Sequence, residues 1–198
     1  MNFYLIRHGE SESREGMNHE KASNVSLSEK GRKEVFLLSK KIKKIKPDKI
    51  FCSPIKRTKE TADILFPDSE KIFEDRIKEQ IISRDKVGKD FKNLKKQGRM
   101  DFDFSSEDGE SFNQTAERFI SFLNEKKKNS NENYFVISHA LIMQASLTKM
   151  FNLEEIPNIE TASISLITWD GSVFKISYLN RSYSNLKNLK NFLKKILQ

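Results

Sequence analysis

The sequence has little cysteine, and it has no long hydrophobic run. One cysteine among 198 residues excludes a disulfide scaffold and a multi-cysteine zinc site, and it suits a reducing compartment. The longest uninterrupted apolar runs, such as Phe3–Ile6, have four residues, whereas a membrane helix needs roughly twenty. Arg7 ends that first run too early for the core of a signal peptide. We therefore expect a soluble, cytoplasmic protein without a membrane span.

Glycine and proline are also scarce, at 7 and 4 residues, and they form neither a P-loop pattern nor a flexible linker. The net charge is +8, from 36 Lys and Arg against 28 Asp and Glu. No basic motif is interleaved with aromatic residues, so we expect no nucleic-acid partner. Residues 184–197 carry lysines and an apolar stripe at helical spacing. They predict a basic amphipathic C-terminal helix that either packs on the domain or binds a membrane surface.

The length and composition predict one domain over residues 1–198. Short apolar runs alternate with stretches of helical periodicity, and Asp170–Gly171 separates two final runs as in a β-hairpin. This order predicts an α/β fold: a three-layer α/β/α sandwich with a mostly parallel sheet and an antiparallel edge strand. The expected strands are Asn2–Ile6, Lys49–Cys52, Tyr134–Ser138, Ile164–Trp169 and Val173–Tyr178, and the expected helices are Ser28–Ile45, Ile55–Leu65, Ser111–Lys128 and Leu141–Phe151.

Two of the three histidines directly follow expected parallel strands. His8 comes after Arg7 at the end of the first strand, His139 follows the third, and Arg57 lies just after the second. Open α/β sheets bind ligands at the carboxyl ends of their strands. If the three strands are neighbours, the two imidazoles and two guanidiniums converge. This set suits a phosphoryl group, because arginine binds phosphate oxygens bidentately and stays charged.

Six motifs add to this pattern by their order and spacing. They are Arg7-His8-Gly9-Glu10-Ser11, Leu27-Ser28-Glu29-Lys30-Gly31, Ser53–Ala62 around Arg57, Arg76-Ile77-Lys78-Glu79-Gln80, Gly109-Glu110-Ser111 and Ile137-Ser138-His139. Together they resemble the histidine phosphatase superfamily, the phosphoglycerate-mutase-like enzymes, over about residues 1–170. Each motif alone is short, but six in register form a specific signal. The resemblance implies the phosphoglycerate-mutase-like version of the predicted fold.

The resemblance also implies a mechanism. His8 would attack phosphorus and become a phosphohistidine, while Arg7, Arg57 and His139 would stabilise charge on the phosphoryl oxygens. Glu79 would protonate the leaving alkoxide and then deprotonate water. Because arginines supply the positive charge, we expect neither a metal nor a cofactor.

Four further residues are expected to bind the substrate: Gly9, Ser11, Arg14 and Ala140. Two of them depart from the family pattern, which often has Asn in place of Arg14 and usually Gly in place of Ala140. Arg14 either holds the same anion more strongly or marks a different course of the loop. A Cβ on Ala140 narrows the approach of phosphate. The irregular segment 66–110 is expected to be a substrate lid.

Two other phosphatase classes fit poorly. The loop of cysteine phosphatases has five residues between Cys and Arg, whereas four separate Cys52 from Arg57, so Cys52 is expected to be a small buried residue. Asp101-Phe102-Asp103 does not end an apolar strand, as an aspartyl-phosphate enzyme requires. Glu110 remains an alternative to Glu79 as the general acid, although a glutamate at the start of a helix also interacts favourably with the helix dipole.

The favoured function is a phosphomonoesterase that hydrolyses small phosphorylated metabolites through a phosphohistidine on His8. A phosphoglycerate mutase is an alternative, although Ile82 stands where such enzymes usually carry Tyr. A protein phosphohistidine phosphatase is another, although its P–N bond needs less help from an acid such as Glu79. The alternative from a different class is a non-catalytic member that binds phosphorylated ligands. The sequence assigns neither the individual substrate nor the oligomeric state.

Overall fold

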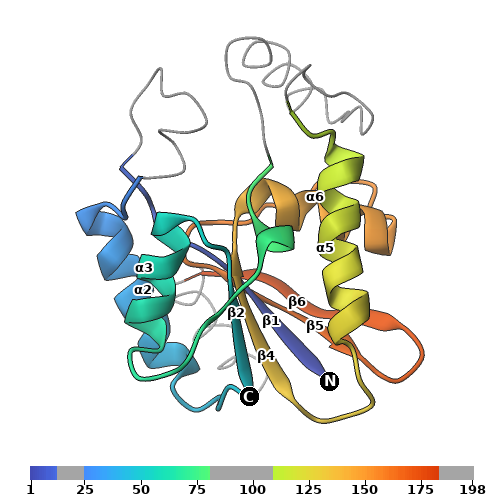
Figure 1. Cartoon of the computed structure of the whole chain (residues 1–198), viewed down its shortest axis with the longest axis horizontal. Coiled ribbons are helices and arrows are strands. Elements are labelled where there is room, and N and C mark those ends of the chain that lie inside the picture. Colours follow the sequence, from blue (N-terminus) through green and yellow to red (C-terminus); the bar gives the residue numbers. More distant parts are fainter. Residues whose placement is uncertain (13–24, 81–108, 183–198) are drawn as a thin grey trace, which may run out of the picture.

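The computed structural model describes residues 1–12, 25–80 and 109–182, which form a sheet with helices on both faces (Figure 1). The strands are β1 (Asn2–Arg7), β2 (Lys49–Cys52), β3 (Ile72–Phe73), β4 (Asn133–Ser138), β5 (Ile164–Trp169) and β6 (Phe174–Arg181). The helices are α2 (Glu29–Ile42), α3 (Lys56–Leu65), α5 (Phe112–Lys126), α6 (Ala140–Phe151) and the 3₁₀ turn η1 (Asp75–Ile77). The strand order is β3-β2-β4-β1-β5-β6, with β5 and β6 antiparallel to their neighbours and the others parallel. The predicted fold class is thus confirmed.

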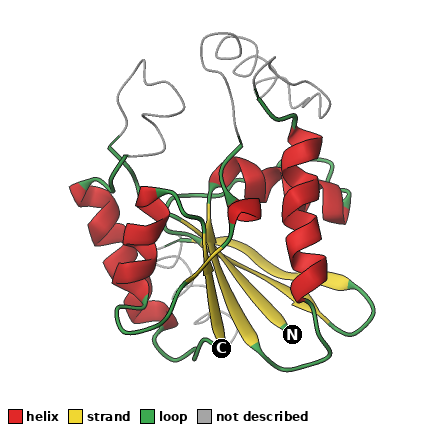
Figure 2. Cartoon of the chain, viewed as in Figure 1, coloured by secondary structure: helices red, strands yellow, loops and turns green. Residues whose placement is uncertain are grey.

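Two helical layers enclose the sheet, as Figure 2 shows with helices in red. Alternate residues of β1 pack against the two helical layers. Phe3 and Leu5 contact the apolar faces of α5 and α6. Tyr4 and Ile6 contact those of α2 and α3. Because both faces of the strand are buried, its sequence is a continuous apolar run rather than an alternating one.

Two of the described helices, α2 and α5, start at residues whose side chains cap them. The Ser28 hydroxyl accepts a hydrogen bond from the N–H of Gly31, 3.0 Å away, at the start of α2. Ser111 and Gln114 form a reciprocal capping box at the start of α5. Such caps satisfy backbone donors that the first turn leaves unpaired, and they fix where each helix begins.

The predicted lid, residues 66–110, contains regular structure in its first part. Ile72 and Phe73 form β3 and pair in parallel with the end of β2, and η1 follows. Ile72 and Phe73 are 39% and 56% exposed, so this two-residue edge strand buries neither residue. The sequence therefore shows no alternation of buried and exposed positions that would mark it as a strand. The prediction of an irregular segment is wrong for these residues.

Three predictions lie outside the described residues: the remainder of the lid over 81–108, the C-terminal helix over 184–197, and Arg14. Within the described ranges, no helix is both long and apolar enough to cross a membrane.

The three strands that precede the candidate residues are neighbours in the sheet. Ile137 of β4 pairs with Cys52 of β2 on one side and with Ile6 of β1 on the other. The strands therefore end at the same level, and this register brings His8 and His139 to one edge of the sheet. That edge is where an open α/β sheet places its ligand site.

Candidate active site

His8 is buried directly after β1, and both of its ring nitrogens have partners. Its backbone N–H donates to the carbonyl of Ser138, and its carbonyl accepts from the N–H of Ala162. Nδ1 lies 2.7 Å from the carbonyl oxygen of Gly9. A carbonyl can only accept, so the proton is on Nδ1 and Nε2 keeps a lone pair. Nε of Arg57 donates to this Nε2 at 3.0 Å.

His139 is fully buried and is held in a matching way. Nη2 of Arg57 lies 3.1 Å from Nδ1 of His139, and the Ser53 hydroxyl lies 2.9 Å from Nε2. A guanidinium can only donate, so Nδ1 accepts and the proton is on Nε2, which donates to Ser53. The two imidazole centroids are 5.1 Å apart. One guanidinium therefore binds both rings.

Burial and nearby cations keep both imidazoles neutral. Burial is the largest cause that lowers the pKa of His8 and of His139 well below 6.5, and the charge of Arg57 is the second. The hydrogen bond to Gly9 opposes this shift for His8. At neutral pH the lone pair on Nε2 of His8 is therefore not lost to protonation.

Arg7 adds a second cation beside the imidazoles. Its Nη1 donates to the carbonyl of Ile159 at 2.6 Å. Its Nε is buried and has no hydrogen-bond partner among the described residues. Burial lowers the pKa of Arg7, whereas Glu79 and Glu34 raise it, and an arginine keeps its charge in this range. A partly buried cation with an unused, buried N–H donor is suited to bind an anion.

Two glycines let the loop after β1 pack against the start of α2. A Cβ on Gly9 would lie 2.6 Å from the carbonyl oxygen of Gly31 and 2.7 Å from Cγ2 of Val35. A Cβ on Gly31 would lie 1.9 Å from the carbonyl oxygen of Glu10. Because the Gly9 carbonyl orients the ring of His8, this close packing positions the imidazole that carries the free lone pair.

Glu79 follows η1, and its carboxylate reaches the start of α6. Oε1 accepts from the backbone N–H groups of Ile142 at 3.2 Å and Gln80 at 3.1 Å, and Oε2 accepts from that of Leu141 at 3.5 Å. Since α6 begins directly after His139, the carboxylate lies at the same edge of the sheet as the second imidazole. The site thus combines two neutral imidazoles, two guanidiniums and one carboxyl group.

This geometry agrees with a family comparison. Residues 3–182 match the family model of the histidine phosphatase superfamily, branch 1. The chain belongs to the histidine phosphatase superfamily. A search of curated proteins finds no match to the chain.

Several solved structures have a similar fold, and each matches most of this chain and nearly all of its own length. A mycobacterial glucosyl-3-phosphoglycerate phosphatase has 17% identity and a TM-score of 0.73, with 91% of this chain and 99% of that chain covered. YhfR of Bacillus stearothermophilus has 20% identity and a TM-score of 0.70, with 89% and 95% covered. A phosphoserine phosphatase mutant from Entamoeba histolytica, in complex with phosphoserine, has 17% identity and a TM-score of 0.69, with 92% and 98% covered. At these identities, the likeness shows the fold.

Two more residues of the superfamily motifs lie close to the start of a helix. Ser11 forms an isolated antiparallel bridge with Leu27, beside the start of α2. Ala140 is the first residue of α6 and directly follows His139. Gly9 and Ser11 therefore belong to the loop that follows β1, and Ala140 begins the helix that follows β4.

Glu110 and Cys52, the alternative candidates for the general acid and the nucleophile, lie in surroundings that do not suit these roles. The carboxylate of Glu110 is bound by Arg118, with Nε 2.7 Å from Oε1 and Nη2 2.8 Å from Oε2, which favours a structural role. Cys52 is buried, as predicted, and burial raises the pKa of its thiol to about 12, so it is not a thiolate nucleophile. In the part of the chain that is described, no three His, Cys, Asp or Glu side chains are placed to hold a metal ion.

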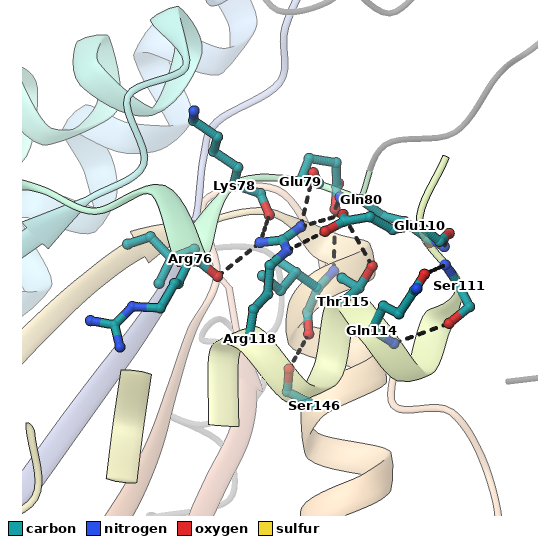
Figure 3. Close-up of polar contacts among 12 residues, drawn as sticks. Arg76, Lys78, Glu79, Gln80, Glu110, Ser111, Gln114, Thr115, Arg118 and Ser146 are labelled. Carbon is teal, nitrogen blue, oxygen red and sulfur yellow. Dashed lines mark hydrogen bonds and ion pairs between the residues drawn. The ribbon is translucent and has the colours of Figure 1, made fainter. Parts of the chain in front are cut away.

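Three residues that hold the site were not among the predicted site residues. Ser53 binds the second imidazole, the Thr61 hydroxyl accepts from the N–H of Gly9 at 3.3 Å, and Arg118 binds backbone carbonyls around Glu79 (Figure 3). Ser53 directly follows β2 at the functional edge, and that position was a usable signal. The other two lie within helices, where no local pattern separates them from ordinary polar residues.

Proposed function

We propose that the protein is a phosphomonoesterase that hydrolyses small phosphorylated metabolites through a phosphohistidine on Nε2 of His8. One observation carries this proposal: the Gly9 carbonyl fixes the proton on Nδ1, so Nε2 presents its lone pair beside the Arg57 guanidinium. A neutral imidazole with a fixed tautomer is a ready nucleophile. The cations around it suit the negative charge of a phosphoryl group.

The first step forms the phosphoenzyme. The lone pair on Nε2 of His8 forms a bond to phosphorus while the bond from phosphorus to the ester oxygen breaks. Protonated Glu79 gives its proton to the departing oxygen, so an alcohol leaves. Arg7 and Arg57 stabilise the charge on the other phosphoryl oxygens, and His139 adds to them in its protonated form, when Nδ1 also carries a proton to donate.

The second step regenerates the enzyme. Water attacks phosphorus as the bond from phosphorus to Nε2 of His8 breaks, and the carboxylate of Glu79 accepts the proton of the attacking water. Inorganic phosphate leaves, His8 is again neutral, and Glu79 is again protonated. Atoms and charges balance over the cycle without a further reagent.

Four residues are proposed to line the substrate site: Gly9, Ser11, Arg14 and Ala140. The position of the first two in the loop after β1, and of Ala140 at the start of the helix after β4, supports this role. Two of the structural neighbours are named as phosphatases of glucosyl-3-phosphoglycerate and phosphoserine. Small phosphate monoesters of this kind are therefore the first substrates to screen, together with a protein phosphohistidine.

The test uses purified full-length protein with p-nitrophenyl phosphate and a panel of phosphate monoesters. We expect turnover by the wild type, and none by His8→Ala above the uncatalysed rate. The matched control is His19→Ala, which removes the only other histidine outside the proposed pair and should keep full activity. An inactive wild type would favour a non-catalytic phospho-ligand-binding protein. Transfer of the phosphoryl group to a second metabolite rather than to water would favour a mutase.

A further inference from the structure

Arg118 on α5 divides its guanidinium between one short segment of chain, residues 76–79, and the carboxylate of Glu110 (Figure 3). Nη1 donates to the carbonyls of Arg76 at 2.8 Å and Lys78 at 2.7 Å, and Nη2 donates to the carbonyl of Glu79 at 3.2 Å. The same guanidinium pairs with both carboxylate oxygens of Glu110, at 2.7 and 2.8 Å. Three nearby backbone carbonyls thus share one planar cation.

Glu110 fixes the orientation of that cation and also holds the segment directly. Its carboxylate accepts from Arg118 and from the Thr115 hydroxyl, the latter at 3.4 Å, and its backbone carbonyl accepts from Nε2 of Gln80 at 2.7 Å. The side chains of Arg118 and Glu110 are only 18% and 23% exposed. An ion pair this shielded is less screened by solvent than a surface pair, so its geometry is well defined.

The far side of the segment is bound to α6 instead. The Glu79 carboxylate accepts from the N–H groups of Leu141 and Ile142, and the Ser146 hydroxyl donates to the carbonyl of Ile142 at 2.6 Å. The chain around Glu79 therefore lies between α5, which grips its backbone, and α6, which receives its carboxylate (Figure 3). The backbone of Glu79 is thus bound by α5, while its carboxylate is bound by α6 and by the N–H of Gln80.

We infer that Arg118 is a positioning residue that holds Glu79 in place as the general acid and base. This inference rests on the proposed function. No other residue type satisfies these acceptors equally, because lysine offers three donors from one point whereas arginine offers five in a fixed plane. The charge of Arg118 also helps to lower the pKa of His139, which supports a location near the imidazole pair.

The test compares two substrates that differ in their need for an acid. Phosphoenzyme formation from an alkyl phosphate releases a poor leaving group and needs the proton of Glu79, whereas p-nitrophenolate leaves without it. For Arg118→Gln we expect kcat/KM to fall about 10- to 100-fold with the alkyl phosphate, less than the roughly 10²–10⁴-fold effect of a general acid. With p-nitrophenyl phosphate we expect a fall of about threefold or less. Arg118→Lys should lie between the wild type and Arg118→Gln.

Arg76→Gln is the matched control. The Arg76 side chain also ties the η1 segment to α5, through Glu125 at 2.6 Å, but its guanidinium points away from Glu79 (Figure 3). It should change kcat/KM for the two substrates by the same small factor. An equal loss for both substrates in Arg118→Gln, or an equal selective loss in Arg76→Gln, would overturn the inference.

Two more variants keep the inference falsifiable. If Arg118→Gln does not fold, Glu110→Gln serves instead, because it removes the charge that orients Arg118, and it should show the same selective loss at smaller size. Glu79→Gln separates this inference from the proposed function. A selective loss in Glu79→Gln without one in the Arg118 and Glu110 variants rejects only the positioning role. No selective loss in Glu79→Gln rejects the proposed acid itself.

Discussion

Arg57 donates from Nε to Nε2 of His8 at 3.0 Å, and the same guanidinium donates from Nη2 to the second imidazole. These bonds require both rings to accept, so each ring is held neutral with a lone pair facing the cation. A phosphoryl group that enters between them would take over the donors of Arg57. The lone pair of His8 would then be free to attack phosphorus.

The first prediction concerns this guanidinium. Arg57→Lys should lower kcat/KM for p-nitrophenyl phosphate by about 10²–10³-fold, because a single ammonium cannot offer the phosphoryl oxygens several donors in a fixed plane as the guanidinium does. Arg32→Lys is the control, since Arg32 makes an exposed ion pair with Glu60. Equal activity of the two variants would contradict the role assigned to Arg57.

The second prediction concerns the partner of His139. Ser53→Ala leaves the buried Nε2–H of His139 without its acceptor, so the free energy of unfolding should fall by about 1–3 kcal/mol. Ser39→Ala removes a hydroxyl that bonds a carbonyl on the partly exposed α2 helix, and it should change stability by about 0.5 kcal/mol or less. Urea denaturation of both variants measures the difference, and equal stabilities would count against a hydrogen bond between Ser53 and His139.

The third prediction is a loss of stability in mild acid. The folded protein keeps His8 and His139 neutral because their pKa values lie well below 6.5, whereas the unfolded chain protonates them as the pH falls through that value. The stability is fully present above pH 6.5 and declines below it. The slope should reach about 1.4 kcal/mol per pH unit for each imidazole.

Urea denaturation at several values between pH 7.5 and about pH 5, above the range in which most carboxylates titrate, measures this slope. A variant with both histidines changed to glutamine should have a flatter profile. The same slope in that variant would show that other groups cause the pH dependence.

The fourth prediction concerns Gly31. Replacing glycine by alanine inside a helix ordinarily stabilises a protein by about 1 kcal/mol. Here a Cβ would lie 1.9 Å from the carbonyl oxygen of Glu10, so Gly31→Ala should destabilise the fold by about 1–3 kcal/mol. Lys40→Ala, at an exposed position of α2, should change stability by about 0.5 kcal/mol or less. A stabilised Gly31→Ala would refute the close packing of the loop.

The sequence alone predicts the sheet that positions the site, and the reason is physical. The three central strands are buried on both faces, so each is a short apolar run with sharp polar ends, and those ends carry His8, Ser53 and His139. The expected segment Lys49–Cys52 coincides with β2, and Tyr134–Ser138 falls one residue short of β4. The sequence does not predict that these three strands are neighbours, and only the strand pairing in the structure establishes it.

The support of the site is less predictable. Arg118 has the same appearance in sequence as a solvated arginine, because its partners include backbone carbonyls of a segment without periodicity. Ile72 and Phe73 form an exposed edge strand, which the alternation of apolar and polar residues cannot mark. Such features depend on tertiary contacts between distant segments rather than on local pattern.

The most direct test of the account is the identity of the phosphorylated atom. Wild-type protein is mixed rapidly with a ³²P-labelled phosphate monoester, quenched in base, digested and mapped by mass spectrometry. The account predicts a label that is stable to base and labile to acid, carried on Nε2 of His8 and absent from His8→Ala. A label on any other residue, or turnover without a phosphoenzyme under conditions that trap one, would contradict it.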